Sequence, residues 1–147
     1  MRNAAAFVGE DSGASAAEFA LVAVPLLLLL VGTIEYGRLL WTQQSMQTLA
    51  ASTARCMGVL QSECSSGGTY SADRTRAHLI AQAGALAVPL SAGNIQLDAN
   101  ASCNGVSNFS RVAIDFEFTT VLPRMLLELA SGTDLAATAC FPNQASS

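Results

Sequence analysis

Hydrophobic residues form one uninterrupted run close to the N-terminus. Positions 19–34 contain no charged residue, and the stretch "LLLLLV" within them has no polar face. These sixteen positions are slightly short of the roughly 20 that cross about 30 Å of hydrocarbon, but positions 14–34 give 21 with Glu18 as the only charged interruption. Residues typical of a membrane–water boundary follow the run: Glu35, Tyr36, Arg38 and Trp41. The pattern predicts a transmembrane helix at 14–40 rather than a buried helix of a soluble protein.

After the membrane run, the apolar positions take on the period of an amphipathic helix. The stripe within positions 41–60 consists of Met46, Leu49, Ala50, Ala54, Met57 and Leu60. One continuous helix is therefore expected from about Ala14 to Val59, with a lipid-embedded half and an amphipathic extension at 41–60. A turn-rich segment, "SECSSGGTYSAD", separates this helix from a second one predicted at 73–87, which Pro89 stops.

The last third of the chain changes to the period of two that is typical of strands. Apolar and polar residues alternate at 95–103 and again at 111–118, and Asn104-Gly105 lies between the two segments. These segments predict an antiparallel pair. A short helix is expected between Pro123 and Gly132, and "DLAATACFP" is expected to form the last strand. The elements predict an α+β fold, in which the long N-terminal helix continues into a small domain with an antiparallel sheet at about 94–142.

Composition and charge narrow the classes of function. The chain has 147 residues, of which 51% are hydrophobic and 12% charged, and this suits one ordered domain with a modest core. Its seven basic residues are all arginine, and eleven acidic residues leave a net charge of −4. Because binding to phosphates needs a basic face, this balance argues against a nucleic-acid partner.

Residue types that carry catalysis are sparse. His78 is the only histidine, and no motif ties a serine or cysteine to it, so it is expected on the surface near Asp73 and Arg74. Asp115 and Glu117 could mimic an acid–base pair, but strand alternation explains them as a solvated face. One histidine and four cysteines expected in disulfides lack the ligands of a transition-metal site. We expect no enzymatic activity, no metal and no cofactor.

The four cysteines, Cys56, Cys64, Cys103 and Cys140, all follow the predicted membrane helix and lack metal-like spacing. They predict two disulfides in an oxidising compartment, which places the domain in the periplasm even though the arginines flanking the helix do not favour that orientation. Of three connectivities, Cys56–Cys64 and Cys103–Cys140 are favoured. The first pair would stand about 12 Å apart in one straight helix, so the helix must end between them. Strand alternation puts Cys140 outward and Cys103 inward, which makes the second bond awkward.

Three kinds of membrane segment fit the N-terminus. A cleavable secretory signal would have a basic leading region and a shorter apolar stretch than this chain has. A plain signal anchor fits better, and a prepilin-type segment, cleaved ahead of an apolar helix that is retained, is the third kind. An ionised carboxylate inside hydrocarbon costs at least a few kcal/mol, so Glu18 either sits in the headgroup layer or has a partner.

The residues around Glu18 resemble a known family. Gly13 followed by "ASAAEF" is similar to the cleavage motif of type IV prepilins, with Glu18 fifth and Phe19 sixth after the glycine. The wider stretch at 13–55, including "EYGR" at the end of the apolar run, resembles the TadE-like proteins of tight-adherence (Tad) pilus assembly. The resemblance implies cleavage between Gly13 and Ala14 by a prepilin peptidase, which removes a leader at 1–13. It also implies that Glu18 pairs with the new amine of Ala14 in the same or a neighbouring subunit.

The resemblance implies a pilin-like fold and a function in the cell envelope. A minor pilin or pseudopilin would take part in assembling Tad-type pili for adhesion and surface colonisation. Its expected partners are other pilin or pseudopilin subunits, the prepilin peptidase and an inner-membrane assembly platform. It would be a single-pass inner-membrane protein with its domain at 41–147 in the periplasm, and it could enter an extracellular pilus. The alternatives are an unprocessed, membrane-anchored scaffold of the same machine and a secreted binding module released after the apolar run.

Overall fold

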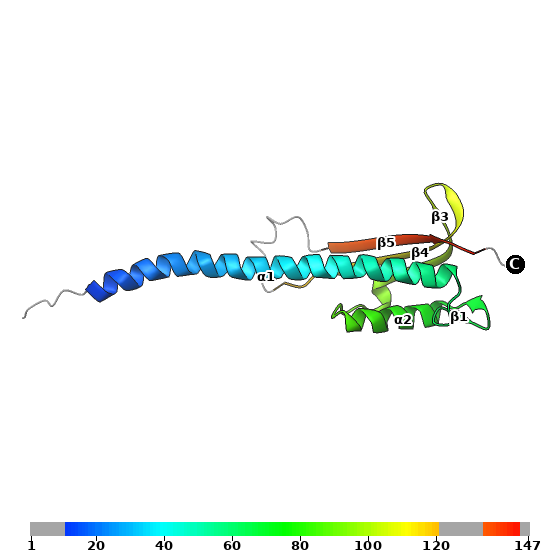
Figure 1. The fold of residues 1–147 in the computed structure, drawn as a ribbon, viewed down its shortest axis with the longest axis horizontal. Helices are drawn as coiled ribbons and strands as arrows, with labels where there is room; N and C mark the ends of the chain where they lie inside the picture. The colour runs from blue at the N-terminus through cyan, green and yellow to red at the C-terminus, as the bar shows by residue number, and fades with distance from the viewer. Residues whose placement is uncertain (1–10, 121–133, 145–147) are drawn as a thin grey trace, which may run out of the picture.

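One long helix runs through the molecule and carries a small domain on its C-terminal half (Figure 1). The structure is a computed structural model that describes residues 11–120 and 134–144. Helix α1 spans Asp11–Gly58, and its 48 residues correspond to a length of about 72 Å. The N-terminal half of α1 projects alone, whereas the C-terminal half lies against the rest of the chain. This confirms the predicted continuous helix, with boundaries within three residues of those expected.

Helix α1 ends where the disulfide prediction requires it to end. Leu60 adopts a left-handed φ of 52°, and the amide of Gln61 donates to the carbonyl of Cys56 at 3.0 Å. The amide of Leu60 donates to the carbonyl of Met57 at 3.2 Å. These two bonds form a Schellman motif, which satisfies carbonyls that the last turn of a helix leaves without intrahelical donors.

The segment after α1 contains a small hairpin that the sequence pattern did not predict. Strands β1 (Ser65–Ser66) and β2 (Thr69–Tyr70) pair antiparallel across two glycines, both with positive φ. Helix α2 then spans Ala72–Ala85, close to the predicted 73–87. It ends in a second Schellman motif, with Ala87 at a left-handed φ of 58° and the amide of Val88 donating to the carbonyl of Ala83 at 2.9 Å. The helix therefore stops before Pro89.

A three-stranded antiparallel sheet forms the rest of the domain. After the short 3₁₀ helix η1 (Ala92–Asn94), strands β3 (Ile95–Cys103), β4 (Val106–Glu117) and β5 (Asp134–Pro142) pair in the order β3-β4-β5. Asn104 and Gly105, with φ of 52° and 81°, make the tight turn that was expected between β3 and β4. The short helix expected between Pro123 and Gly132 lies outside the described residues.

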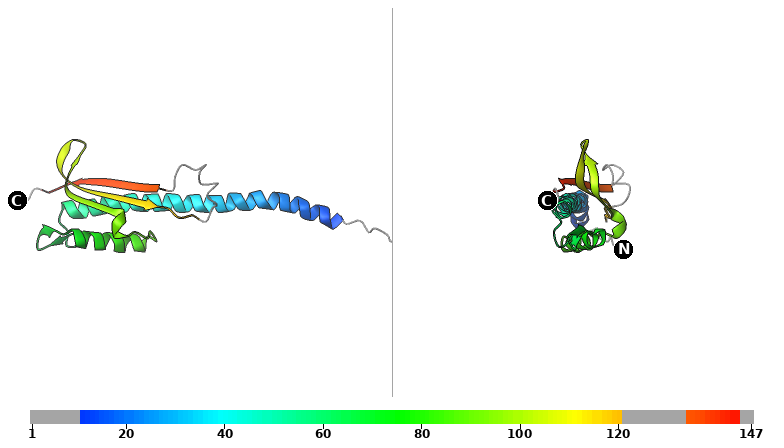
Figure 2. Two further views of the ribbon diagram at one scale, coloured as in Figure 1. Left: turned by 180° about the vertical axis from the view of Figure 1, so that it is seen from behind. Right: turned by 90° about the vertical axis from the view of Figure 1, so that its right-hand side faces the viewer.

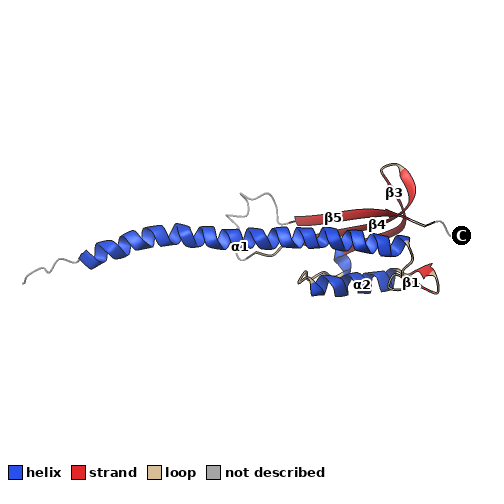
Figure 3. Ribbon diagram, viewed as in Figure 1, coloured by secondary structure: helices blue, strands red, loops and turns tan. Residues whose placement is uncertain are grey.

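The C-terminal half of α1 lies between the sheet and α2, as the end-on view in Figure 2 shows. Figure 3, coloured by secondary structure, shows β5 and α2 on opposite sides of α1. The apolar stripe of α1 faces this interior from Met46 to Met57, and Met46, Ala50 and Ala54 are fully buried. Leu60, which was predicted to continue the stripe, lies beyond the end of α1 and is 44% exposed. Helix α2 contributes buried residues from its inner face, and β4 and β5 contribute the inward positions of their alternation. These positions are Leu79, Ala83, Val112, Ile114, Leu135 and Ala137.

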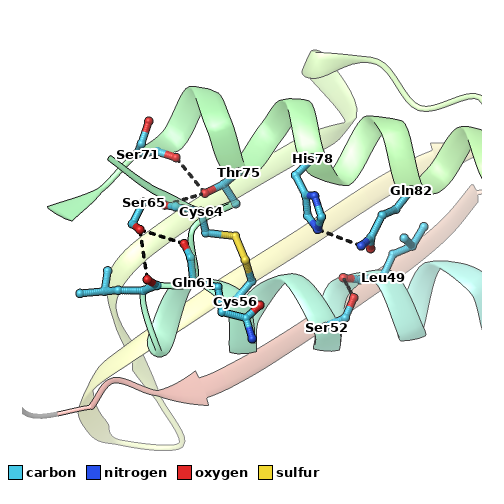
Figure 4. The surroundings of a disulfide bond; sticks show 11 residues. Leu49, Ser52, Cys56, Gln61, Cys64, Ser65, Ser71, Thr75, His78 and Gln82 are labelled. Carbon is cyan, nitrogen blue, oxygen red and sulfur yellow. Dashed lines mark hydrogen bonds between the residues drawn. A yellow bond between two sulfur atoms is a disulfide. The ribbon is translucent and has the colours of Figure 1, made fainter. Parts of the chain in front are cut away.

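Both favoured cysteine pairs are bonded. Cys56–Cys64, here named the helix disulfide, ties the last turn of α1 to the loop before β1 and lies beside α2 (Figure 4). Cys103–Cys140, here named the sheet disulfide, joins β3 to β5 across the intervening β4.

The geometry of the sheet removes the objection that strand alternation raised against the sheet disulfide. In a flat sheet, Cα atoms two strands apart would be about 9.6 Å from each other, but those of Cys103 and Cys140 are 6.6 Å apart. The register of β3 with β4 shifts on either side of Ala101, and Asn108 on β4 has a positive φ of 70°. These irregularities distort the regular strand pairing near the hairpin tip. Cys140 is exposed and Cys103 is half-buried, as their parities predict, and the short distance between the two strands allows the bond nevertheless.

Candidate membrane anchor and processing site

The projecting half of α1 exposes almost all of its apolar side chains. Phe19, Leu21 and Leu29 are 75%, 78% and 69% exposed, and the leucine run between them is more than half exposed. Burying a single leucine or phenylalanine stabilises by roughly 1.5–3 kcal/mol, so leaving this whole surface in water would be very unfavourable. Within the described part of the chain, one helix, Ser15–Gly58, has the length and composition to cross a membrane, and none of its most apolar window is buried.

The spacing of charged and aromatic residues along α1 indicates what length of the helix can lie in the hydrocarbon. Glu18 and Glu35 are 17 residues apart, which corresponds to about 26 Å along the helix axis. Phe19 and Trp41 are 22 residues apart, or about 33 Å, which is close to the thickness of the hydrocarbon core. Trp41 is 61% exposed and suits the interface. A membrane placed between these two aromatic residues has Glu18 at one boundary and Glu35 about 9 Å inside the other.

The burial of Glu35 is a feature of the site that the sequence did not reveal. This residue is only 7% exposed, and its Oε1 accepts a hydrogen bond from a guanidinium nitrogen of Arg38 at 2.7 Å. The Arg38 guanidinium also lies over the ring of Phe118, 5.5 Å from its centroid. The three-residue spacing of Glu35 and Arg38 was the one available signal, but it could not show that Phe118, from the end of the sheet, completes the group.

The Glu35–Arg38–Phe118 group has two physical effects. It neutralises a carboxylate that lies within one turn of the uncharged run, where an unpaired charge would be costly. It also joins the residue that follows β4 to the helix at the point where the domain meets the anchor. Trp41 lies at the same junction, with its indole nitrogen 3.5 Å from the carbonyl of Leu86 at the end of α2.

The residues expected to be processed lie in the first turns of α1. The backbone at Gly13 and Ala14 is helical, because α1 begins at Asp11. Ala14 and Glu18 are four residues apart in this helix and therefore share one face, as expected. Glu18 and Phe19 are both exposed. The structure brings these positions together on one helix end, and cleavage and amine pairing remain predictions.

Other candidate chemistry is not assembled into a site. His78 on α2 shares a hydrogen bond of 2.8 Å with Gln82, in the surroundings of the helix disulfide (Figure 4). Asp115 and Glu117 are exposed on β4, in agreement with a solvated strand face. Among the residues that the structure describes, no three His, Cys, Asp or Glu side chains are grouped so as to hold a metal ion.

Comparison with known proteins supports the family resemblance over the anchor and its extension. Residues 13–55 match the family model described as TadE-like protein. No curated protein and no solved structure matches the chain significantly. The matched segment begins at Gly13, includes the whole exposed apolar run and ends one residue before the helix disulfide. Over residues 13–55, the chain is similar to the TadE-like proteins.

Proposed function

We propose that this protein is a minor pilin or pseudopilin that takes part in the assembly of Tad-type pili. The observation that carries the proposal is a single helix whose exposed apolar half and buried amphipathic half together make up the TadE-like segment. The exposed half holds the subunit in the inner membrane. The buried half presents the domain on the periplasmic side, where an oxidising environment maintains both disulfides.

In this proposal the exposed half of α1 has two successive environments. It lies in lipid before assembly, and it packs against the apolar helices of neighbouring subunits when the protein enters a filament. Glu18 favours one axial register in such a bundle, because an unpaired carboxylate in an apolar environment is strongly destabilising and the amine of Ala14 on a neighbouring subunit can compensate it.

Cleavage between Gly13 and Ala14 requires that this bond leave the helix. The described helix includes both Gly13 and Ala14, so its turn around this bond must open for the peptidase. The new amine at Ala14 then lies one turn before Glu18. Processing removes Asp11, which is the nearest acidic neighbour on the N-terminal side of Gly13.

An unprocessed, membrane-anchored scaffold is the second candidate. Two observations favour it. Helix α1 includes Gly13 and extends back at least to Asp11. The segment before Gly13 contains one basic residue, Arg2, and two acidic residues, Glu10 and Asp11. In this candidate the domain would stay at the membrane and present its surface to the assembly machine, and Glu18 would act only as an interfacial charge.

The mass and N-terminal sequence of the protein recovered from its native membrane separate the two candidates. A start at Ala14 that is lost in Gly13→Leu supports the pilin, provided that the matched variant Gly32→Leu, near the C-terminal end of the membrane run, is still cleaved. A start at Met1 in the wild-type protein rejects it in favour of the scaffold. Glu18→Gln should be cleaved normally but be depleted from isolated filaments.

A further inference from the structure

Strand β3 carries a sequence that is the acceptor motif for N-linked glycosylation. Asn100-Ala101-Ser102 has the form Asn-X-Ser with X other than proline, and an acidic residue, Asp98, lies two positions before the asparagine. The motif occurs a second time on β4, at Asn108-Phe109-Ser110. Such motifs are short and arise by chance, so the surroundings of each asparagine decide whether a transferase can reach it.

The first motif is accessible. Asn100 and Ser102 are exposed, whereas Ala101 between them is 4% exposed and holds the strand against the domain. Strand β3 is at the edge of the three-stranded sheet. The register shift between Asp98 and Ala101 leaves Asn100 without a Cα partner on β4. The backbone amide of Asn100 donates instead to the carboxylate Oδ1 of Asp98 at 3.0 Å.

The second motif is closed by hydrogen bonds to the C-terminal end of the described chain. Ser110 is 1% exposed, and its hydroxyl donates to Oδ1 of Asn143 at 2.6 Å. The backbone amide of Asn143 donates to the carbonyl of Asn108 at 3.0 Å, and its Nδ2 lies 3.4 Å from Oδ1 of Asn108. A transferase could engage Ser110 only after these contacts had opened.

We propose that Asn100 is a site of N-linked glycosylation and that Asn108 is not modified in the folded domain. The proposal rests on the proposed placement of the domain in the periplasm. The required donor is a glycan linked to a polyprenyl pyrophosphate, and the required enzyme is a membrane oligosaccharyltransferase. Nδ2 of Asn100 forms a bond to C1 of the first sugar as the C1–O bond to pyrophosphate breaks. The pyrophosphate takes the electron pair, and the amide proton passes to a base and then to water.

The position of β3 in the molecule suits a bulky modification. The hairpin formed by β3 and β4 rises from the sheet at the end of the domain that lies opposite the projecting anchor (Figures 1 and 2). A glycan on Asn100 would therefore stay clear of both the lipid and the exposed apolar face of α1. It would also cover part of the open edge of the sheet, which is otherwise able to pair with another strand.

The test uses the full-length, disulfide-bonded protein in detergent, incubated with a purified bacterial oligosaccharyltransferase and its lipid-linked donor. Intact mass should increase by one glycan per chain, and peptide mapping should locate it at Asn100. Asn100→Gln and Ser102→Ala should lose the increase, and Ser102→Thr should keep it. Asn108→Gln is the matched control and should be modified as the wild-type protein is. Asp98→Ala should be modified more slowly, because the contact that orders the acceptor is lost.

Reduced and denatured protein serves as the positive control, since both motifs are then open. Modification of the denatured chain together with an unmodified native chain would overturn the proposal, and so would native modification at Asn108 in place of Asn100. Because this assay uses purified protein, its outcome is independent of the proposed location. Location has its own measurement: both disulfides should be found intact in protein extracted from cells under thiol-blocking conditions.

Discussion

Two glycines at the ends of the two helices should respond in opposite ways to the same substitution. Gly58 is the last residue of α1, and a Cβ added to it would lie 2.6 Å from Cδ1 of Phe141 and 3.1 Å from the carbonyl oxygen of Pro142. Gly84 lies in the last turn of α2, and a Cβ there would meet nothing within 4 Å. Both residues are in helical backbone, so alanine would lower the conformational entropy of the unfolded chain similarly at each position.

The magnitudes follow from these distances. Replacing glycine by alanine in a helix stabilises by roughly 0.5–1 kcal/mol, so Gly84→Ala should raise the free energy of unfolding by about that amount. At Gly58, carbon atoms that pack best at about 3.5–4.0 Å would be forced about 1 Å too close. The ring of Phe141 would have to move, although it packs against the core, and overpacking of this kind costs about 1–3 kcal/mol. Gly58→Ala should therefore be destabilised by about 1–2 kcal/mol.

The two variants can be compared by urea unfolding of the full-length protein in micelles, followed by circular dichroism. Phe141→Leu provides the decisive control. It should be destabilising alone, but in the Gly58→Ala background it should cost less, because the smaller side chain leaves room for the new methyl group. Stability of Gly58→Ala equal to that of the wild-type protein, or additive effects in the double variant, would refute the contact between the end of α1 and β5.

Three further predictions concern other parts of the domain. The sheet disulfide should be reduced by dithiothreitol before the helix disulfide, because Cys140 is exposed whereas both cysteines of the helix disulfide are at most 2% exposed. Alkylation and peptide mapping at intervals give the order of reduction, and the reverse order would contradict this prediction. Ala87→Gly should stabilise the protein by about 1 kcal/mol in a thermal melt, since glycine adopts the left-handed φ of 58° without strain, whereas Ala85→Gly within α2 should destabilise it. Burial raises the pKa of Tyr70 above its usual 10.0, so the unfolded state loses this proton first as the pH rises. The free energy of unfolding should therefore fall above about pH 10, and a Tyr70→Phe variant that falls as steeply would refute this assignment.

The sequence predicted the elements of the domain well wherever one period extended over many residues. The uncharged run, the helical stripe from Met46 to Met57 and the alternation at 95–103 all correspond to observed elements. The hairpin at Ser65–Tyr70 was missed because two-residue strands are too short to show a period. The sheet disulfide was judged awkward because parity along each strand does not show how closely β3 and β5 approach, and that approach depends on the irregular pairing with β4.

The candidate site was predictable only in part, for a related reason. Gly13, Ala14 and Glu18 are close in sequence, so helical spacing alone relates them to one another. The Glu35–Arg38–Phe118 group also requires Phe118, which is 83 positions after Glu35. No local pattern indicates that this residue, which follows β4, reaches α1.

The junction between anchor and domain is short and rigid. The last uncharged residue of the membrane run is Ile34, and Glu35, which follows it, is already buried by the domain. Arg38 and Trp41, both within about 11 Å of Ile34 along the helix axis, contact the end of the sheet and the end of α2. No turn or coil interrupts α1 between them. With α1 in a membrane, the domain would stand directly on the membrane surface, and its orientation relative to the membrane would change only if α1 itself tilted or bent. A rotation of the anchor, such as packing into a filament would impose, is thus transmitted to the whole domain.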